Sequence, residues 1–250
     1  MTRSRTPRLS VNVNKVATIR NSRGGTVPSV VDAVTACVAA GAPGITVHPR
    51  RDARHITTQD VRAIAAALRA LGGTVEYNIE GDPRPDLLEL IHEVKPDQVT
   101  LVPVKPGEIT SQAGWPPETP AAEIQATVRR LQDDGIRVSL FIDPAADAAR
   151  WAASMGANRI ELYTEPFARA FAASPESGQA SFQRYADVAL LAHELGLGIN
   201  AGHDLDLTNL PLFRTLPHLD EVSIGHALVS RALFVGLDRA VREYLVALGA

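Results

Sequence analysis

The chain has 250 residues, of which 45% are hydrophobic and 21% are charged, and its formal net charge is −3. This balance is typical of a folded globular protein, and it gives no overall basic character of the kind that nucleic acid or an anionic membrane would attract. Cys37 is the only cysteine, which excludes an internal disulfide framework and favours a reducing compartment. No stretch approaches 18 apolar residues, so we expect a cytoplasmic protein with neither a nucleic-acid nor a membrane partner.

Short segments rich in Val, Ile and Leu recur along the chain, each bounded by Gly, Pro, Asp or Asn, as β-strands are. They cover residues 8–14, 44–49, 73–80, 98–104, 137–143, 159–164, 197–203 and 221–226. Between them, Ala and Leu recur at three- and four-residue spacing, which predicts helices. The clearest predicted helices are residues 27–42, 57–72, 121–135 and 181–196.

Eight strands that alternate with helices over this length predict an α/β protein folded as a single (β/α)8 TIM barrel. A doubly wound sheet is the competing fold, but the first strand is not followed by the glycine-rich turn of its dinucleotide-binding version. We expect one domain over residues 1–250, with residues 1–7 as a flexible tail. Residues 105–120 and 164–180 look like long loops on one face.

Alternation along a barrel strand turns every second side chain to the interior. In this chain the inward side chains are mostly polar, whereas barrel interiors are usually filled by branched aliphatic residues. They are Asn12, Asn14, Thr46, His48, Glu76, Asn78, Glu80, Arg159, Glu161, Tyr163, Ser223 and Gly225. Buried polar groups need partners, so this interior predicts a working cavity.

Three histidines fall at the C-terminal ends of predicted strands, the face on which barrel enzymes place their active sites. They are His48, His203 and His226. Together with the inward Glu76 and Glu161, they could transfer protons near neutral pH. An internal salt bridge is the alternative interpretation of the two glutamates. The histidines that fall in helix or loop sequence, His92, His193 and His218, are interpreted as ordinary structural residues.

The predicted loops also carry signals for phosphate. The loops after the seventh and eighth strands, residues 200–207 and 224–233, contain glycines whose backbone amides could approach an anion. The first two loops add cationic side chains, which are Arg20, Arg23, Arg50, Arg51, Arg54 and His55. These features predict a barrel enzyme with one or two phosphorylated substrates.

Several strings are more specific than these general patterns. In chain order, VNVNKVATIRNSRGG, HPRRDARHIT, VEYNIEG, NAGHDL and VSIGHALV resemble the pyridoxine 5'-phosphate synthase family of the deoxyxylulose-dependent vitamin B6 pathway, from about Arg8 to Leu245. The resemblance implies a (β/α)8 barrel that joins 1-deoxy-D-xylulose 5-phosphate to 3-amino-2-oxopropyl phosphate, with ring closure and release of phosphate and water. It also implies a cytoplasmic homo-oligomer, as large as an octamer, with no metal and no organic cofactor.

The resemblance implies roles for particular residues. His48, Glu76 and His203 match the catalytic acid–base residues, and Glu161 matches a glutamate that stabilises the transition state. The matches to substrate-binding positions are Asn12, Arg23, Gly225 and His226 for the aminoketone phosphate, Arg50, His55 and Thr110 for the deoxyxylulose phosphate, and Asn14, Lys15 and Asp204 beside them. The loop at residues 105–120, with Thr110 and Gly114, would serve as a lid.

Some positions depart from the family pattern. Asn14 and Lys15 stand where better-known members have Asp and His, Val104 replaces a Glu, and Asp204 replaces a Gly. Lys15 could bind a substrate phosphate directly.

Three other functions stay open from the sequence. The first is a metal-dependent barrel isomerase or hydrolase whose ligands are Glu76, Glu161, His203 and Asp204. The second is a non-catalytic protein that binds phosphorylated metabolites, and the third is a Schiff-base aldolase that uses Lys15.

Overall fold

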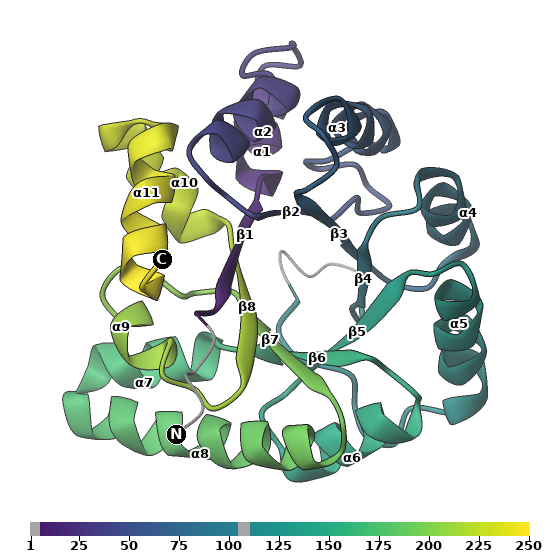
Figure 1. Cartoon of the computed structure of the whole chain (residues 1–250), viewed down its shortest axis with the longest axis vertical. Helices are drawn as coiled ribbons and strands as arrows, with labels where there is room; N and C mark the ends of the chain where they lie inside the picture. Colours follow the sequence, from purple (N-terminus) through teal and green to yellow (C-terminus); the bar gives the residue numbers. More distant parts are fainter. Residues whose placement is uncertain (1–5, 105–110) are drawn as a thin grey trace.

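The chain folds around a closed barrel of parallel strands, paired in sequence order from β1 to β8 and back to β1 (Figure 1). A computed structural model describes residues 6–104 and 111–250. The strands are β1 (Arg8–Asn12), β2 (Gly44–Val47), β3 (Glu76–Gly81), β4 (Gln98–Leu101), β5 (Arg137–Ile142), β6 (Arg159–Tyr163), β7 (Gly198–Gly202) and β8 (Leu219–Ile224). All eight predicted strands are therefore confirmed, as is the (β/α)8 barrel.

Eleven helices lie outside the barrel in the described part of the chain, as the ring of ribbons in Figure 1 shows. They are α1 (Asn14–Asn21), α2 (Val30–Ala39), α3 (Thr58–Ala70), α4 (Pro85–Val94), α5 (Ala121–Asp133), α6 (Ala146–Ser154), α7 (Glu165–Ala173), α8 (Pro175–Glu194), α9 (Leu210–Phe213), α10 (His226–Val235) and α11 (Leu237–Leu248). The four helices predicted from periodicity correspond to α2, α3, α5 and α8.

Helix α3 illustrates how the sequence specifies these elements. Thr57 and Asp60 form a capping box, because each side chain accepts the backbone N–H of the other. Val61, Ile64 and Leu68 follow at helical spacing and are buried against the barrel.

The prediction of a long loop over residues 164–180 is wrong, because this segment forms α7 and the first turn of α8. Pro175 occupies the first turn of α8, where its missing N–H costs nothing, and the Ser174 hydroxyl accepts the N–H of Ser177 at 3.1 Å. Phe167 of α7 is fully buried, with its ring centroid 5.0 Å from that of Phe213. Proline is common in loops and in the first turn of helices alike, so its presence does not distinguish the two.

The lower part of the barrel interior is filled by the protein's own polar side chains. The hydroxyls of Ser10 and Thr46 lie 2.7 Å apart, and the Asn78 amide donates to Thr46 Oγ1 at 3.3 Å. Thr100 Oγ1 lies 3.2 Å from Asn78 Oδ1 and 3.4 Å from Glu161 Oε2. The predicted polar interior is confirmed, and below the mouth of the barrel many of its groups bond to one another, although Ser139 Oγ and Glu221 Oε2 have no partner among the described residues.

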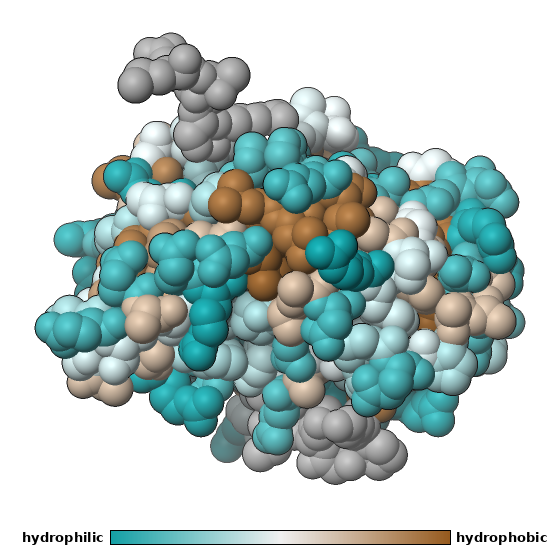
Figure 2. Space-filling view, turned by 90° about the horizontal axis from the view of Figure 1, so that it is seen from below, coloured by the Kyte–Doolittle hydropathy of each residue, from teal (hydrophilic) through white to brown (hydrophobic). Residues whose placement is uncertain are grey.

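The outer surface is mostly hydrophilic on the side that Figure 2 shows, with one compact hydrophobic patch among polar side chains. Among the most exposed big apolar side chains of the whole described surface are Leu233, Phe234 and Val246, at 69%, 86% and 70%. They lie on the neighbouring helices α10 and α11. Over the described residues, no helix combines the length and apolar character needed to cross a membrane.

Candidate active site

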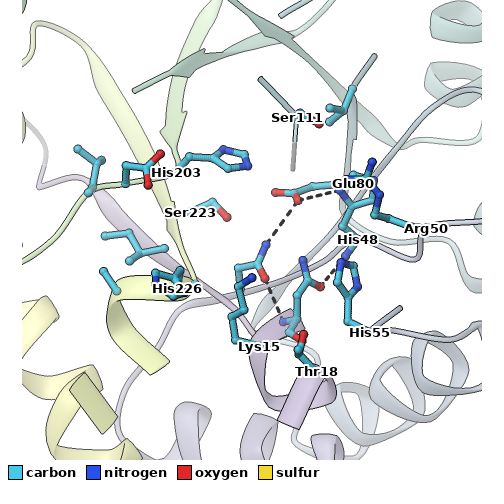
Figure 3. A pocket seen from close by; sticks show the side chains of 18 of the residues that line it. Lys15, Thr18, His48, Arg50, His55, Glu80, Ser111, His203, Ser223 and His226 are labelled. Atoms are coloured by element: carbon cyan, nitrogen blue, oxygen red, sulfur yellow. Dashed lines mark hydrogen bonds and ion pairs between the residues drawn. The ribbon is translucent and has the colours of Figure 1, made fainter. Parts of the chain in front are cut away.

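A cavity of about 400 Å³ opens at the C-terminal ends of the strands. Its walls come from β1, β2, β3, β6, β7 and β8 and from the loops and helices that follow them (Figure 3). This volume is within the range of small-molecule sites. The cavity is at the face predicted from the ends of the strands.

A histidine and a carboxyl group face each other on adjacent strands in this cavity. Nδ1 of His48, just past β2, lies 3.7 Å from Oε2 of Glu80 in β3 (Figure 3). Both side chains are buried, and Nε2 of His48 has no hydrogen-bond partner among the described residues. Glu80 therefore occupies the Nδ1 side of the ring, and the buried Nε2 is left without a protein partner in the described part of the chain.

Burial shifts the pKa of both groups toward the neutral form. Burial, followed by the charge of Arg50, lowers the pKa of His48 well below its ordinary value. Burial, followed by the nearby Glu161 and Glu221, raises the pKa of Glu80 well above the ordinary carboxyl value. A neutral imidazole and a protonated carboxyl can accept and donate a proton near neutral pH.

Two asparagines connect β1 to this pair. Asn12, the last residue of β1, donates from Nδ2 to Glu80 Oε2 at 3.4 Å. The backbone N–H of Asn14 donates to Asn12 Oδ1 at 3.0 Å, and Asn14 Oδ1 accepts the backbone N–H of His48 at 2.9 Å. The cavity wall at this point is therefore one connected set of contacts.

His203 enters the cavity from the end of β7 (Figure 3). Its ring centroid lies 5.3 Å from that of Phe141 and 6.1 Å from that of Tyr163, and its buried Nδ1 has no partner among the described residues. Its backbone has a positive φ of 72°, and its carbonyl accepts the Thr164 hydroxyl. Burial lowers the pKa of His203, so this imidazole is also neutral near pH 7.

The cationic wall comes from α1 and from the loop after β2. Lys15, Arg50 and His55 all line the cavity, and the last two are buried. Nδ1 of His55 accepts the backbone N–H of Ile56 at 2.9 Å, which leaves the ring proton on Nε2. Burial, then Arg50 and Lys15, lowers the pKa of His55 to about 4, so this ring donates a hydrogen bond without adding charge.

A buried arginine fixes the base of this wall. Arg84 donates to the carbonyl of Pro49 at 2.6 Å and pairs with Asp82 at 2.5 Å. Since Pro49 lies between His48 and Arg50, Arg84 holds the segment that carries both.

The opposite wall contains the start of α10. Gly225 precedes the helix, and no side chain caps its first turn. A Cβ at position 225 would lie 3.0 Å from the Asn12 carbonyl oxygen, so a side chain would crowd β1. His226 and Ala227 of the first turn line the cavity. Uncapped N–H groups at a helix start are suited to an anion such as phosphate.

Glu161 lies just below the cavity. It is buried in β6, and a Cβ at Gly202 would lie 2.5 Å from its Oε1, so it packs beneath the Gly202–His203 backbone. Burial and the nearby Glu221 raise the pKa of Glu161, which favours its protonated form.

Glu76, which we expected in the cavity, does not line it. Glu76 is the first residue of β3, at the opposite end of the barrel, where its carboxylate forms ion pairs with Arg8 and Arg137. Alternation turns Glu76 and Glu80 to the same face, but four residues separate them by about 13 Å along a strand. The alternative interpretation, an internal salt bridge, fits Glu76, but the partners are Arg8 and Arg137 and not Arg159.

Other expected residues are also separated from the cavity. Arg23 follows α1, is exposed and does not line the cavity. Thr110 lies outside the described residues. Gly114 packs against the end of β5: its N–H donates to Asp143 Oδ1 at 3.1 Å, and a Cβ there would lie 2.3 Å from Ile142 Cα.

The remaining expected residues come together as predicted. The cavity lining includes Asn12, Asn14, Lys15, His48, Arg50, His55, His203, Asp204, Gly225 and His226. The polar lining residues that the sequence did not single out for the site are Thr18, Glu80, Ser111, Tyr163 and Ser223. Alternation had placed Glu80, Tyr163 and Ser223 inward without showing that they reach the mouth. The position of Glu80 at the end of β3, directly before Gly81 and a proline-rich turn, is the signal that could have identified it.

The proposed metal ligands do not converge. Within residues 6–104 and 111–250, no group of three or more His, Cys, Asp or Glu side chains is arranged to hold a metal ion. Glu76 in particular lies at the far end of the barrel from His203 and Asp204.

Comparison with known families gives an extended match. The family described as pyridoxal phosphate biosynthesis protein PdxJ matches residues 9–250. A pyridoxine 5'-phosphate synthase of Porphyromonas gingivalis is 50% identical over 238 residues, which cover 95% of this chain and 97% of the relative. A synthase of the same name from Leptospira biflexa is 49% identical over 247 residues, covering 95% of each chain.

Solved structures with little sequence similarity share the fold. 3-Keto-L-gulonate-6-phosphate decarboxylase from Vibrio cholerae has a TM-score of 0.62 at 12% identity, covering 98% of this chain and 99% of that one. The structure named KGPDC from Streptococcus mutans has a TM-score of 0.63 at 11% identity, covering 98% of both chains. At these identities the similarity concerns the barrel alone.

Proposed function

Since the chain belongs to the PdxJ family of pyridoxal phosphate biosynthesis proteins, we propose that it is a pyridoxine 5'-phosphate synthase, which joins 1-deoxy-D-xylulose 5-phosphate to 3-amino-2-oxopropyl phosphate by acid–base catalysis. The observation that carries the mechanism is the buried His48–Glu80 pair, with His203 also in the cavity. These three groups line one cavity, so replacing any of them would remove a proton donor or acceptor that the reaction uses.

Two anion-binding features support two phosphorylated substrates. The wall of Lys15, Arg50 and His55 suits the phosphate of the deoxyxylulose substrate. The start of α10 at Gly225 and His226 suits the phosphate of the aminoketone. With the phosphates on these two walls, the carbon and nitrogen atoms that react would lie between His48 and His203.

The chemistry requires repeated proton transfers. The amine of the aminoketone attacks the ketone of the sugar and water leaves, which forms an imine between the substrates. Loss of phosphate and of a further water, together with closure of the ring between carbon atoms, then gives the pyridine. His48 and Glu80 would exchange protons with carbon and oxygen on one side of the ring, and His203 would do so on the other. Glu161, protonated beneath His203, would stabilise charge that develops there.

The direct test is an assay of purified, chelator-treated protein with both substrates. We expect pyridoxine 5'-phosphate and free phosphate to appear together, at a rate that chelation does not change, because protonation steps on imidazole and carboxyl groups carry the mechanism. Restoration of a lost rate by one added divalent metal would contradict this mechanism. Binding of both substrates without product would instead favour a non-catalytic protein, and borohydride trapping of substrate on Lys15 would favour a Schiff-base aldolase.

We also propose that the protein is a cytoplasmic homo-oligomer. The exposed Leu233, Phe234 and Val246 of α10 and α11 support this, since a second copy could cover them. Light scattering after gel filtration should give a mass that is a multiple of 26.7 kDa. Phe234→Glu should shift the distribution toward the single chain. Leu71→Glu is the control, because Leu71 is also exposed but lies at the C-terminal end of α3, and it should leave the distribution unchanged. A monomeric wild-type protein would contradict the proposal.

A further inference from the structure

The strongest feature that the proposed reaction leaves unexplained is the loop of contacts that Asn14 closes at the mouth of the barrel. His48 N–H donates to Asn14 Oδ1, Asn14 N–H donates to Asn12 Oδ1, and Asn12 Nδ2 donates to Glu80 Oε2. Oε2 of Glu80 then lies 3.7 Å from Nδ1 of His48, which completes the cycle. The four residues come from three consecutive strands or their ends.

Asn14 has an unusual place in this cycle. The β1–β2 ladder ends with the N–H of Val13 donating to the carbonyl of Thr46 at 3.2 Å. One step further along β2, the acceptor for His48 N–H is the Asn14 side chain, because the backbone has already turned into α1. The side chain therefore extends the ladder by one hydrogen bond and fixes the backbone from which the His48 imidazole projects.

The chemical nature of residue 14 also matters, because an Asp has the same shape and could accept the same N–H. The charged and titratable groups that act on the His48 imidazole are Arg50 and His55 from the loop after β2, Arg84 before α4 and His203 after β7, with Glu80 of β3 at its Nδ1. The same cavity is lined by Lys15, Arg54, Asp204 and His226. The fixed charges that act on the imidazole, those of Arg50 and Arg84, are cationic, and the carboxyl of Glu80 favours its protonated form. An amide at position 14 leaves this cationic balance intact, whereas a carboxylate would offset part of it.

We propose that Asn14 is a positioning residue for His48, and that its uncharged amide fixes the imidazole beside Glu80 while leaving it a neutral base. The proposal rests on the function proposed above for its kinetic consequences, but the positioning and the charge balance concern the protein without substrate. The two can therefore be tested separately.

The first measurement is the titration of the His48 ring by NMR in the full-length protein without substrate, with the signal assigned from His48→Gln. In Asn14→Asp the acceptor remains, so the ring should stay in place while its pKa rises by about one unit or more. Thr18→Asp is the matched control, since Thr18 lines the same cavity one turn further along α1 and does not contact His48 N–H. It should shift the His48 titration by less. An unchanged titration in Asn14→Asp would overturn the charge part of the proposal whether or not the protein makes pyridoxine 5'-phosphate.

The second measurement separates position from charge in the steady-state kinetics. Asn14→Ala removes the acceptor, and we expect kcat to fall about tenfold or more with a smaller change in KM, since small displacements of a reacting group carry costs of this order. Asn14→Asp should keep more of kcat than Asn14→Ala at a pH above the raised pKa, and its acid limb should lie at higher pH. Wild-type kcat in Asn14→Ala would overturn the positioning role. If the wild-type protein gives no product, the proposed function fails, and the NMR titration still decides the present proposal.

Discussion

Glu80→Gln should lower kcat by about 10²–10⁴, the range for loss of a general acid or base, with little loss of folding stability. Glutamine keeps the shape of a protonated glutamate and can still contact Asn12 and His48, but it cannot give up or take a proton. The substitution leaves no new unpaired charge in the cavity, because burial already raises the pKa of Glu80 and favours its neutral form. The measurement is the rate of pyridoxine 5'-phosphate formation at saturating substrate, together with a urea unfolding curve.

Glu76→Gln is the matched control, since it makes the same chemical change on the same strand and the same face. Glu76 binds Arg8 and Arg137 at the far end of the barrel, so its variant should keep a kcat close to the wild-type value. It should lose stability by about 1–3 kcal/mol, because the Glu76 carboxylate is buried, at 7%, whereas both arginines are about one-third exposed, at 33% and 29%, so that water compensates for only part of the lost pairs. Loss of activity in Glu76→Gln with retention in Glu80→Gln would return the catalytic role to the residue that the family resemblance indicated.

The exchange of Glu76 for Glu80 shows what a sequence pattern can and cannot determine in a barrel. A period of two establishes which side chains point inward, and it correctly grouped Glu76, Asn78 and Glu80. It carries no information on height along the barrel axis, which decides whether an inward carboxyl pairs with Arg137 below or with His48 at the mouth. Height follows from where a strand ends, and the ends depend on the register with neighbouring strands.

The residues predicted most successfully are those whose position does not depend on register. His48 directly follows an apolar run, and His203 and His226 each follow a glycine at the end of a strand segment, so the end of each strand is visible in the sequence itself. The segment at 164–180 failed for a different reason. Its prolines and serines are the residues of loops and of helix starts alike, and only the burial of Phe167 among other aromatic rings distinguishes the two.

His48→Gln should lower kcat/KM by about 10³ and should also change the shape of the pH profile. Burial and the charge of Arg50 lower the pKa of His48, so in the wild-type protein the imidazole gains its proton only as the pH falls well below 6.5. Burial with Glu161 and Glu221 raises the pKa of Glu80, so this carboxyl keeps its proton above its ordinary range and loses it as the pH rises through the raised value. A mechanism that needs neutral His48 and protonated Glu80 therefore gives a bell whose acid limb lies below the ordinary histidine pKa.

The acid and basic limbs of the pH profile belong to the interacting His48–Glu80 pair as a whole. The His48→Gln variant separates the two contributions. In His48→Gln the base that protonates on the acid side is absent, so the residual rate should lose the acid limb and keep a fall on the basic side. The check is kcat/KM measured from about pH 5 to about pH 9 in the wild-type protein and the variant. A variant profile that is the wild-type bell scaled down would show that His48 does not set the acid limb. His203, another buried imidazole with a lowered pKa, would then be the residue to replace, because it lines the same cavity.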